Sequence, residues 1–278
     1  MRHPDPDRDA LSAAAPVPGL VATDLDGTLL RSDGTVSART ARVLAELDRR
    51  GVPVVFVTGR PTRWMEVVRR HVGGHGLAIC SNGAVVLRLR DDVVELVRSL
   101  PEEAGAAVVH DLRAALPEVR FAIESVEGFG MEPDYPAMHP VPPGCPVEPI
   151  GLLLRRRPVK LMVRHPTLDP DAFLAVVDEV AAGRAVPTRS GTTAMVELSA
   201  AGVTKASTLE LLCDRFGVAR EDVVAFGDMP NDLPMLAWAG RSFAVGEAHP
   251  ALDAVVTDRA GSNDEDGVAV ELEALFGL

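Results

Sequence analysis

The chain has 278 residues, of which 47% are hydrophobic and 24% are charged, and its formal net charge at pH 7 is −12. That length allows two domains or one large one, and the acidic balance argues against a general binder of nucleic acid or of anionic membranes. The three cysteines are widely separated and form no CxxC pattern, which favours a reducing compartment. No apolar run is long enough to span a bilayer, so we expect a soluble protein of the cytoplasm.

Taken from the N-terminus, residues 1–18 are rich in proline, aspartate and alanine, and we expect a disordered tail there. Short apolar segments that predict buried strands then alternate with amphipathic segments that predict helices. The strand-like segments are 20–22, 52–57 and 77–80, and the helix-like segments are 37–50 and 61–72. Strands separated by helices form βαβ units, so this part predicts a parallel sheet with a site at the carboxyl ends of its strands.

The pattern changes after residue 83 and resumes after residue 200. Between these points the sequence predicts a hairpin, a helix, a strand, an irregular loop and a strand–helix–strand series, at 84–100, 102–116, 120–125, 127–149, 158–164, 171–182 and 192–198. Beyond them it predicts helices at 204–216 and 231–239, and strands at 222–226, 242–245 and 254–257. The predicted fold class is α/β, with a doubly wound, mostly parallel sheet formed by 19–83 and 201–278 and an α+β domain inserted at 84–200.

Chemically reactive residues occur in four separate motifs at predicted strand ends or helix starts, namely DLDGT at 24–28, TGR at 58–60, Lys205, and GDMPND at 227–232. Two carboxylates at the end of a buried strand, Asp24 and Asp26, are costly to desolvate unless a cation lies beside one of them. One aspartate can attack phosphorus while a second transfers the proton, and Mg²⁺ prefers carboxylate oxygens. Together the motifs favour phosphoryl transfer, which depends mostly on positioning and electrostatic stabilisation.

Ordinary structural roles stay open for some of these residues taken alone. Asp228 and Asp232 would suit helix caps, and Asn82 would suit a turn. Lys205 is harder to explain, because a cation is unfavourable at a helix N-terminus and the chain has only one other lysine, Lys160. A specific anionic partner for Lys205 is therefore the favoured interpretation.

In this order the motifs resemble those of the haloacid dehalogenase superfamily. Asp24 and Thr58 are only 58 − 24 = 34 positions apart, which leaves no room for a domain between them. Thr58 and Lys205 are 205 − 58 = 147 positions apart, and a large insertion there resembles the Cof-type phosphatases with an α/β cap of the second class. SNGA at 81–84 and NDEDGVA at 263–269 are similar to that branch as well.

The resemblance implies a Mg²⁺ site and a set of catalytic residues. Asp24 would be the nucleophile and a metal ligand, while Asp26 would be the general acid/base and bind the metal through its backbone carbonyl. Asp228 would be the third metal anchor, and Asp232 would orient Lys205 or a metal-bound water. Lys205 would neutralise the charge between the nucleophile and the phosphate.

The resemblance also implies which residues hold the substrate. They are Leu25, Thr58, Gly59, Asn82, Lys205 and Asn231. Leu25 and Gly59 would contact the substrate through their backbone atoms. One departure is visible, because such proteins often have GNA where this chain has GEA at 246–248. Glu247 stands at the position of that asparagine, so any contact that the asparagine makes in those proteins is in doubt in this chain.

We therefore expect a Mg²⁺-dependent phosphatase that hydrolyses a small phosphorylated metabolite, with a sugar phosphate as the first candidate, through an aspartyl-phosphate at Asp24. The alternatives are a phosphotransferase or mutase, a non-catalytic phosphometabolite sensor, and a receiver-like module phosphorylated on aspartate. We expect no nucleic-acid or membrane partner, and the sequence leaves the substrate and the oligomeric state open.

Overall fold

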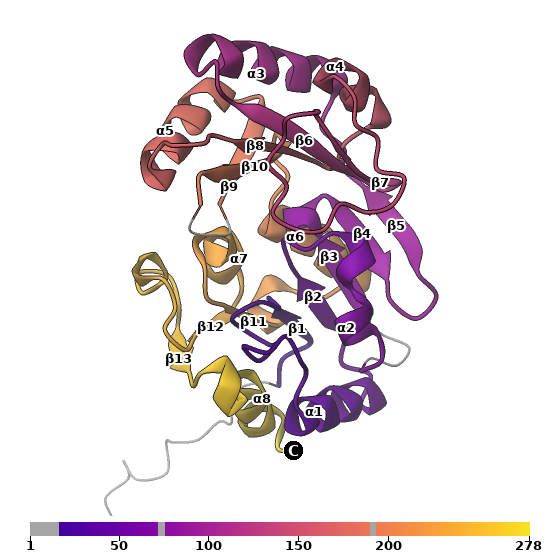
Figure 1. The fold of residues 1–278 in the computed structure, drawn as a ribbon. Helices are drawn as coiled ribbons and strands as arrows, with labels where there is room; N and C mark the ends of the chain where they lie inside the picture. The colour runs from indigo at the N-terminus through magenta and orange to yellow at the C-terminus, as the bar shows by residue number, and fades with distance from the viewer. Residues whose placement is uncertain (1–16, 72–75, 190–192) are drawn as a thin grey trace, which may run out of the picture.

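A computed structural model describes residues 17–71, 76–189 and 193–278, so nearly all of the predicted tail lies outside the described residues. An eight-stranded sheet in the order β13-β12-β11-β1-β2-β3-β4-β5 forms the larger lobe (Figure 1). Its strands are β1 (Leu20–Thr23), β2 (Val54–Val57), β3 (Leu77–Cys80), β4 (Val85–Arg88), β5 (Val93–Val97), β11 (Val223–Gly227), β12 (Arg241–Val245) and β13 (Asp258–Ala260). The pairings from β13 to β3 are parallel, and those of β4 with β3 and β5 are antiparallel.

Helices cover both faces of this large sheet. They are α1 (Ala38–Arg49) and α8 (Gly267–Phe276) on one face, and α6 (Lys205–Phe216) and α7 (Leu233–Trp238) on the other. Successive residues of β1 alternate between the two faces, because Val21 packs in the cluster with α1 and α8 while Leu20 packs in the cluster with α6 and α7. Burial on both faces explains why the strands read as continuous apolar runs.

A second sheet in the order β7-β6-β8-β10-β9 forms the smaller lobe, and all its pairings are antiparallel. Its strands are β6 (Arg120–Ser125), β7 (Gly128–Met131), β8 (Lys160–Arg164), β9 (Ala185–Thr188) and β10 (Met195–Ala200). Helices α3 (Glu102–Ala115), α4 (Ile150–Leu153) and α5 (Pro170–Ala181) cover the face that points away from the large sheet (Figure 1). The opposite face of the second sheet therefore points toward the larger lobe (Figure 1).

The predicted fold class is confirmed, but the assignment of the hairpin at 84–100 to the inserted domain is wrong. Strand β4 pairs with β3, and β5 pairs with β4, so the hairpin extends the large sheet. Val85 and Val86 are buried on opposite faces of that sheet, in the two separate core clusters. A hairpin pattern shows that two strands pair with each other, but not which third strand they join. The remaining domain boundaries stay predictions.

Three local predictions also differ from the structure. Residues 254–257 contain a turn and no strand, and the edge strand of the large sheet is β13. Val255 and Val256 are apolar because they pack against the core on the α7 side. The segment predicted as one helix at 61–72 contains a 3₁₀ turn at Thr62–Trp64 and the short α2 (Glu66–Arg69), and residue 72 lies outside the described residues. The strands β7 and β9 were not predicted.

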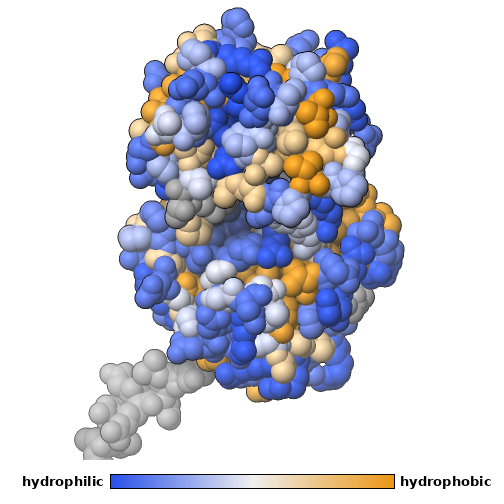
Figure 2. Space-filling model, viewed as in Figure 1, coloured by the Kyte–Doolittle hydropathy of each residue, from blue (hydrophilic) through white to orange (hydrophobic). Residues whose placement is uncertain are grey.

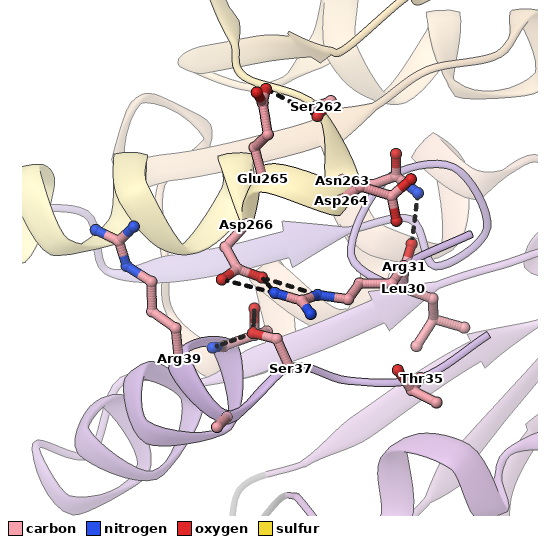
Figure 3. A network of polar contacts seen from close by, with 12 residues as sticks. Leu30, Arg31, Thr35, Ser37, Arg39, Ser262, Asn263, Asp264, Glu265 and Asp266 are labelled. Atoms are coloured by element: carbon pink, nitrogen blue, oxygen red, sulfur yellow. Dashed lines mark hydrogen bonds and ion pairs between the residues drawn. The ribbon is translucent and has the colours of Figure 1, made fainter. Parts of the chain in front are cut away.

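The segment 262–266 ties the loop after β1 to the start of α8 (Figure 3). Asn263 donates its side-chain amide to the Leu30 carbonyl at 2.8 Å, and Arg31 pairs with Asp266 at 3.0 Å. These contacts explain the acidic NDED sequence, whose side chains hold the loop that follows the first motif. In the described parts of the chain, no helix is long and apolar enough to cross a membrane.

Candidate active site

The first and last motifs meet where the winding of the large sheet reverses. Asp24 follows β1, and Asp228 follows the neighbouring strand β11. In doubly wound sheets this is the position of the binding crevice. Gly27 has a φ of +78°, and a Cβ on it would lie 2.3 Å from an Asp228 carboxylate oxygen, so glycine lets the DLDGT loop pass beside Asp228.

A buried lysine joins two of the carboxylates. Lys205 is 1% exposed, and its ammonium lies 2.7 Å from an oxygen of Asp24 and 2.6 Å from an oxygen of Asp232. It is the first residue of α6, after a Thr204 N-cap that accepts a hydrogen bond from the backbone of Ser207. The predicted anionic partners of Lys205 are therefore present as these two carboxylates.

Burial dominates the electrostatics of the acidic cluster. It raises the pKa of Asp24 to about 8, although Lys205 opposes the rise, and it raises the pKa of Asp228 to about 6, although a hydrogen bond from Thr28 opposes that rise. Burial alone would lower the pKa of Lys205, but Asp232 and Asp24 outweigh it and raise that pKa. Lys205 thus stays charged and faces more carboxylates than it can neutralise.

The donor set fits a divalent cation. Carboxylate oxygens of Asp24, Asp228 and Asp232 all lie within 4.8 Å of one another. Within the described residues, one oxygen of Asp24 and one of Asp228 have no hydrogen-bond partner, since Lys205 and Thr28 each engage only the other oxygen. Mg²⁺ prefers such oxygens, and its charge would offset the excess of carboxylates.

Asp232 is placed differently from the other two carboxylates. It is fully buried, one of its oxygens contacts Lys205, and the other accepts hydrogen bonds from the backbone amides of Asp228 and Met229 at 3.1 Å each. These contacts suit the orienting role that the resemblance implies for Asp232. Its role as a direct metal ligand stays a prediction.

Asp26 pairs with an arginine that received no role from the sequence. The Arg60 guanidinium contacts both oxygens of Asp26, at 2.8 and 2.5 Å, and the Asp26 side chain is 59% exposed. The hydrogen bonds from Arg60 to Asp26 also raise the pKa of Arg60, so the guanidinium remains charged. Arg60 belongs to the TGR motif, but only its two preceding residues had been assigned a contact.

The remaining predicted residues line the loops beside Asp24. Thr58 is 1% exposed, and within the TGR loop its hydroxyl accepts the backbone N–H of Arg60 at 3.0 Å. The Leu25 side chain is buried in the core. Asn231 donates its amide to the side-chain oxygen of Asn82 at 3.2 Å, and the Asn231 oxygen is buried without a partner in the described parts of the chain. Their phosphate contacts stay predictions.

Asn82 faces the second sheet. Its side-chain amide donates to the Thr188 hydroxyl and to Glu197, at 3.1 Å each. The structure thus brings Asn82 to Asn231 and to the second sheet, whereas its predicted contact with the substrate stays a prediction. Glu247, where the resemblance leaves a contact in doubt, is exposed on the loop after β12.

A hydrogen bond and an ion pair that the sequence did not reveal join the lobes. Lys160 of β8 is 4% exposed, donates to the Gly59 carbonyl at 2.8 Å, and pairs with Glu197 at 2.8 Å. Arg63 pairs with the buried Glu124 of β6. The scarcity of lysine was the one available signal for Lys160, whereas nothing in the sequence distinguished the two glutamates from surface residues.

A cavity of about 310 Å³ lies between the lobes, where the surface in Figure 2 is hollowed. From the large lobe it is lined by residues that include Asp24, Asp26, Thr58, Gly59, Arg60 and Asn231. From the second sheet and its loops it is lined by residues that include Glu124, Phe129, Tyr135, Lys160, Met162, Met195 and Glu197. Asp24 and Asp26 therefore lie in the wall of a cleft between the lobes.

Residues 21–272 match the family of haloacid dehalogenase-like hydrolases. The chain belongs to this family. Among curated relatives, the 5-amino-6-(5-phospho-D-ribitylamino)uracil phosphatase YitU of Bacillus subtilis is 28% identical, over 94% of this chain and 98% of the relative. A phosphoglycolate phosphatase of Methanopyrus kandleri is 28% identical, over 92% of this chain and 97% of the relative.

Solved structures of this superfamily share the whole fold. The phosphatase BT1666 of Bacteroides thetaiotaomicron superposes with a TM-score of 0.83 at 24% identity, covering 98% of this chain and all of the other. The subclass IIB sugar phosphatase BT4131 gives 0.76 at 19% identity, covering 93% of this chain and 98% of the other. The predicted family and fold are confirmed, and this haloacid dehalogenase-like hydrolase is a phosphoric monoester hydrolase.

Proposed function

We propose that this hydrolase is a Mg²⁺-dependent phosphatase that acts on a small phosphorylated metabolite through a phosphorylated Asp24. The contact between the Lys205 ammonium and Asp24, at 2.7 Å, is the observation that carries the proposal. A buried carboxylate beside a buried cation can approach a phosphate dianion, because the cation offsets the repulsion between the two anions. The nearby oxygens of Asp24 and Asp228 would hold Mg²⁺, which supplies further charge neutralisation when bound.

The reaction would proceed in two displacements at phosphorus. In the first, an Asp24 oxygen bonds to phosphorus, the ester P–O bond breaks, and the leaving oxygen receives a proton from Asp26. In the second, Asp26 takes a proton from water, the water oxygen bonds to phosphorus, and the bond to Asp24 breaks. Asp26 suits this exchange because its side chain is 59% exposed and lines the cavity.

The first candidate for the substrate is a sugar or sugar-alcohol phosphate. The sequence favours a small metabolite, and among the relatives the YitU phosphatase is named for a phosphoribityl compound. The net charge of −12 supports a protein without nucleic-acid or membrane partners. The described cysteines Cys80, Cys145 and Cys213 are free, which supports a reducing, cytoplasmic location.

Trapping the intermediate tests this function. Acid quenching during turnover of a ³²P-labelled ester should leave label on the wild-type protein and none on Asp24→Asn, which should also lose turnover. Asp264→Asn, which changes a carboxylate that contacts Ser32 and belongs neither to the acidic cluster nor to the cavity lining, serves as the matched control and should retain label. Full activity in Asp24→Asn would overturn the proposal, and transfer of label to an added alcohol in place of water would favour the phosphotransferase alternative.

A further inference from the structure

The chain passes between the two lobes twice, and one arginine connects the two crossings. The first crossing lies between β5 of the large sheet and α3 of the smaller lobe, and the second lies between β10 of the second sheet and α6 (Figure 1). Arg98 follows β5 directly, and its guanidinium donates to the Gly202 carbonyl of the second crossing at 3.1 Å. The two segments that join the lobes are therefore bonded to each other at this point.

The same guanidinium reaches the first turn of α6. One of its nitrogens donates to the Ser207 hydroxyl at 2.8 Å and to the Thr208 hydroxyl at 2.7 Å. Ser207 also completes the cap of this helix, because its hydroxyl accepts the backbone N–H of Thr204 while its own N–H donates to the Thr204 side chain. Arg98 thus holds the helical turn that begins with Lys205.

Thr208 extends this network to the turn that contains Asn82. Thr208 is fully buried, and its hydroxyl donates to the Gly83 carbonyl at 2.7 Å. Gly83 has a φ of +111°, and a Cβ on it would lie 2.2 Å from the Thr204 carbonyl oxygen, so the turn packs directly on the start of α6. Ser81 and Asn82 also have positive φ values, a conformation that persists only where the surroundings hold it. The start of α6 is part of those surroundings.

The chemistry of Arg98 suits a connecting role. Among the described residues no carboxylate contacts it, and its acceptors are one carbonyl and two hydroxyl groups. A planar guanidinium holds several N–H donors in a fixed geometry, so it sets the relative positions of the groups that it bonds. Arg98 is not one of the described residues that line the cavity between the lobes, so it does not touch a substrate held there.

We propose that Arg98 is a positioning residue that holds the first turn of α6, and with it the Lys205 ammonium, in place beside Asp24. The inference rests on the proposed phosphatase function, in which Lys205 offsets the repulsion between the nucleophile and the phosphate. Lys205 is fully buried between Asp24 and Asp232 at the first position of α6, so a shift of that turn displaces its ammonium. Because the repulsion grows as the two anions come together, such a shift lowers kcat more than it raises KM.

Arg98→Met tests the inference in the full-length protein, with p-nitrophenyl phosphate and saturating Mg²⁺. We expect kcat, referred to the folded fraction measured by circular dichroism, to fall about 10-fold while KM changes less than about twofold, since displacing a catalytic group by roughly 1 Å can cost about 100-fold. A wild-type kcat in this variant would overturn the inference.

Arg184→Met is the matched control. Arg184 is also a partly buried arginine, and it donates to the Asp111 carboxylate and to the Val180 carbonyl, both within the smaller lobe. Its loss removes a comparable set of hydrogen bonds without touching α6, so kcat per folded molecule should stay at the wild-type value. An equal fall of kcat in Arg184→Met and Arg98→Met would show a general effect of destabilisation and would overturn the inference.

A double-mutant cycle determines whether Arg98 acts through α6. Thr208→Val keeps the shape of the side chain but removes the hydroxyl that joins Arg98 to the Gly83 carbonyl. Each single variant should lower kcat, and the loss in the double variant should be clearly smaller than the product of the two single losses, because both changes break the same contact. A loss equal to that product would show that Arg98 acts by another route.

Arg98→Lys keeps the test decisive if Arg98→Met does not fold. A single ammonium retains the positive charge but lacks the planar fork that bonds both hydroxyls and the carbonyl. We expect kcat to fall about threefold at an unchanged KM, a smaller loss than in Arg98→Met, because part of the network is retained. Wild-type kcat values in both Arg98→Lys and Thr208→Val would overturn the inference.

The outcomes separate this inference from the function beneath it. If the wild type and the Arg98 variants hydrolyse the ester with equal kcat, the positioning role is wrong and the phosphatase function stands. If the wild type hydrolyses no phosphate ester with Mg²⁺ present, the proposed function is contradicted and the positioning role falls with it.

Discussion

Lys160 of the second sheet donates a hydrogen bond to the carbonyl oxygen of Gly59, at 2.8 Å. Gly59 belongs to the TGR loop that we expect to hold the phosphoryl group. The same ammonium pairs with Glu197, whose other oxygen accepts the Asn82 amide at 3.1 Å. One buried lysine therefore connects the smaller lobe directly with the TGR loop of the larger lobe and, through Glu197, with the loop that carries Asn82.

Lys160→Met should lower both stability and activity. Loss of the lysine leaves Glu197 buried without its cation, and breaking a buried pair in this way costs about 3–5 kcal/mol. We expect kcat/KM for p-nitrophenyl phosphate to fall about 10- to 100-fold, because displacing a positioning group by roughly 1 Å can cost about 100-fold. Urea unfolding and steady-state kinetics measure the two effects separately.

The double variant Lys160→Met/Glu197→Gln is the matched control. It removes the uncompensated carboxylate, so it should recover much of the stability lost in Lys160→Met, whereas the missing bond to Gly59 keeps activity low. Wild-type kcat/KM in the double variant would contradict a positioning role for Lys160.

Arg60→Met should reduce activity while leaving the fold almost unchanged. The pair between Arg60 and Asp26 is largely open to solvent on the Asp26 side, and exposed pairs contribute about 0–1 kcal/mol to stability. Without the guanidinium, Asp26 loses the contact that fixes its orientation. We expect kcat to fall about 10-fold, a part of the roughly 10²- to 10⁴-fold that acid–base catalysis contributes.

The pair between Arg49 and Glu46 on α1 supplies a control of the same chemistry, since the Arg49 side chain is 70% exposed. Arg49→Met should change the free energy of unfolding by about as little as Arg60→Met does, and it should leave kcat unchanged. A kcat for Arg60→Met equal to that of Arg49→Met would show that Arg60 does not position Asp26.

The catalytic cluster was predictable because each of its residues stands at a strand end or helix start with a distinctive neighbour. Two aspartates at the end of a predicted buried strand, Asp24 and Asp26, signalled a missing partner, and so did the unfavourable position of Lys205 at a helix N-terminus. The structure supplies partners for Asp24 and Lys205 in each other and in Asp232. Alternation of strands and helices was likewise enough to predict the parallel sheet, since both faces of β1 are buried.

The contacts between the lobes were not predictable in this way. Glu124 and Glu197 lie in strands whose polar residues look like ordinary solvent-facing positions, because alternation alone does not distinguish a cavity face from an exposed one. The hairpin at 84–100 was misplaced for a related reason, since its apolar residues would be buried in either sheet. Arg60 lay inside a recognised motif, but its partner Asp26 is 34 positions away in the sequence.

Asp228→Asn should weaken Mg²⁺ activation more than it weakens turnover. Asp228 offers one oxygen with no partner among the described residues, and its other oxygen accepts the Thr28 hydroxyl at 2.7 Å, which an amide oxygen can also accept. We expect the Mg²⁺ concentration for half-maximal activity to rise about tenfold or more, by analogy with the 10- to 100-fold effects of altered metal surroundings. Asp264→Asn should leave that concentration unchanged, and an unchanged value in Asp228→Asn would place the ion elsewhere.

Stability of the metal-free protein should fall as pH rises from about 4 to about 8. The pKa of Asp24 is raised to about 8 and that of Asp228 to about 6, so the folded protein retains protons that the unfolded chain has already released. The folded state binds more protons across this window, and its free energy of unfolding must therefore decrease with pH. The lowered pKa of His71 acts in the opposite direction below about 6.5, and the lowered pKa values of carboxyl groups such as Glu46 and Glu273 do so near the lower end of this window.

Urea unfolding in EDTA at pH 5 and pH 8 measures this dependence. Asp228→Asn removes one of the raised carboxylates and leaves His71 in place, so the decrease between the two pH values should be smaller in the variant than in the wild type. Saturating Mg²⁺ should reduce the decrease as well, since a bound cation favours the ionised carboxylates. A free energy of unfolding that rises with pH by the same amount in both proteins would show that these aspartates are ionised in the folded, metal-free state.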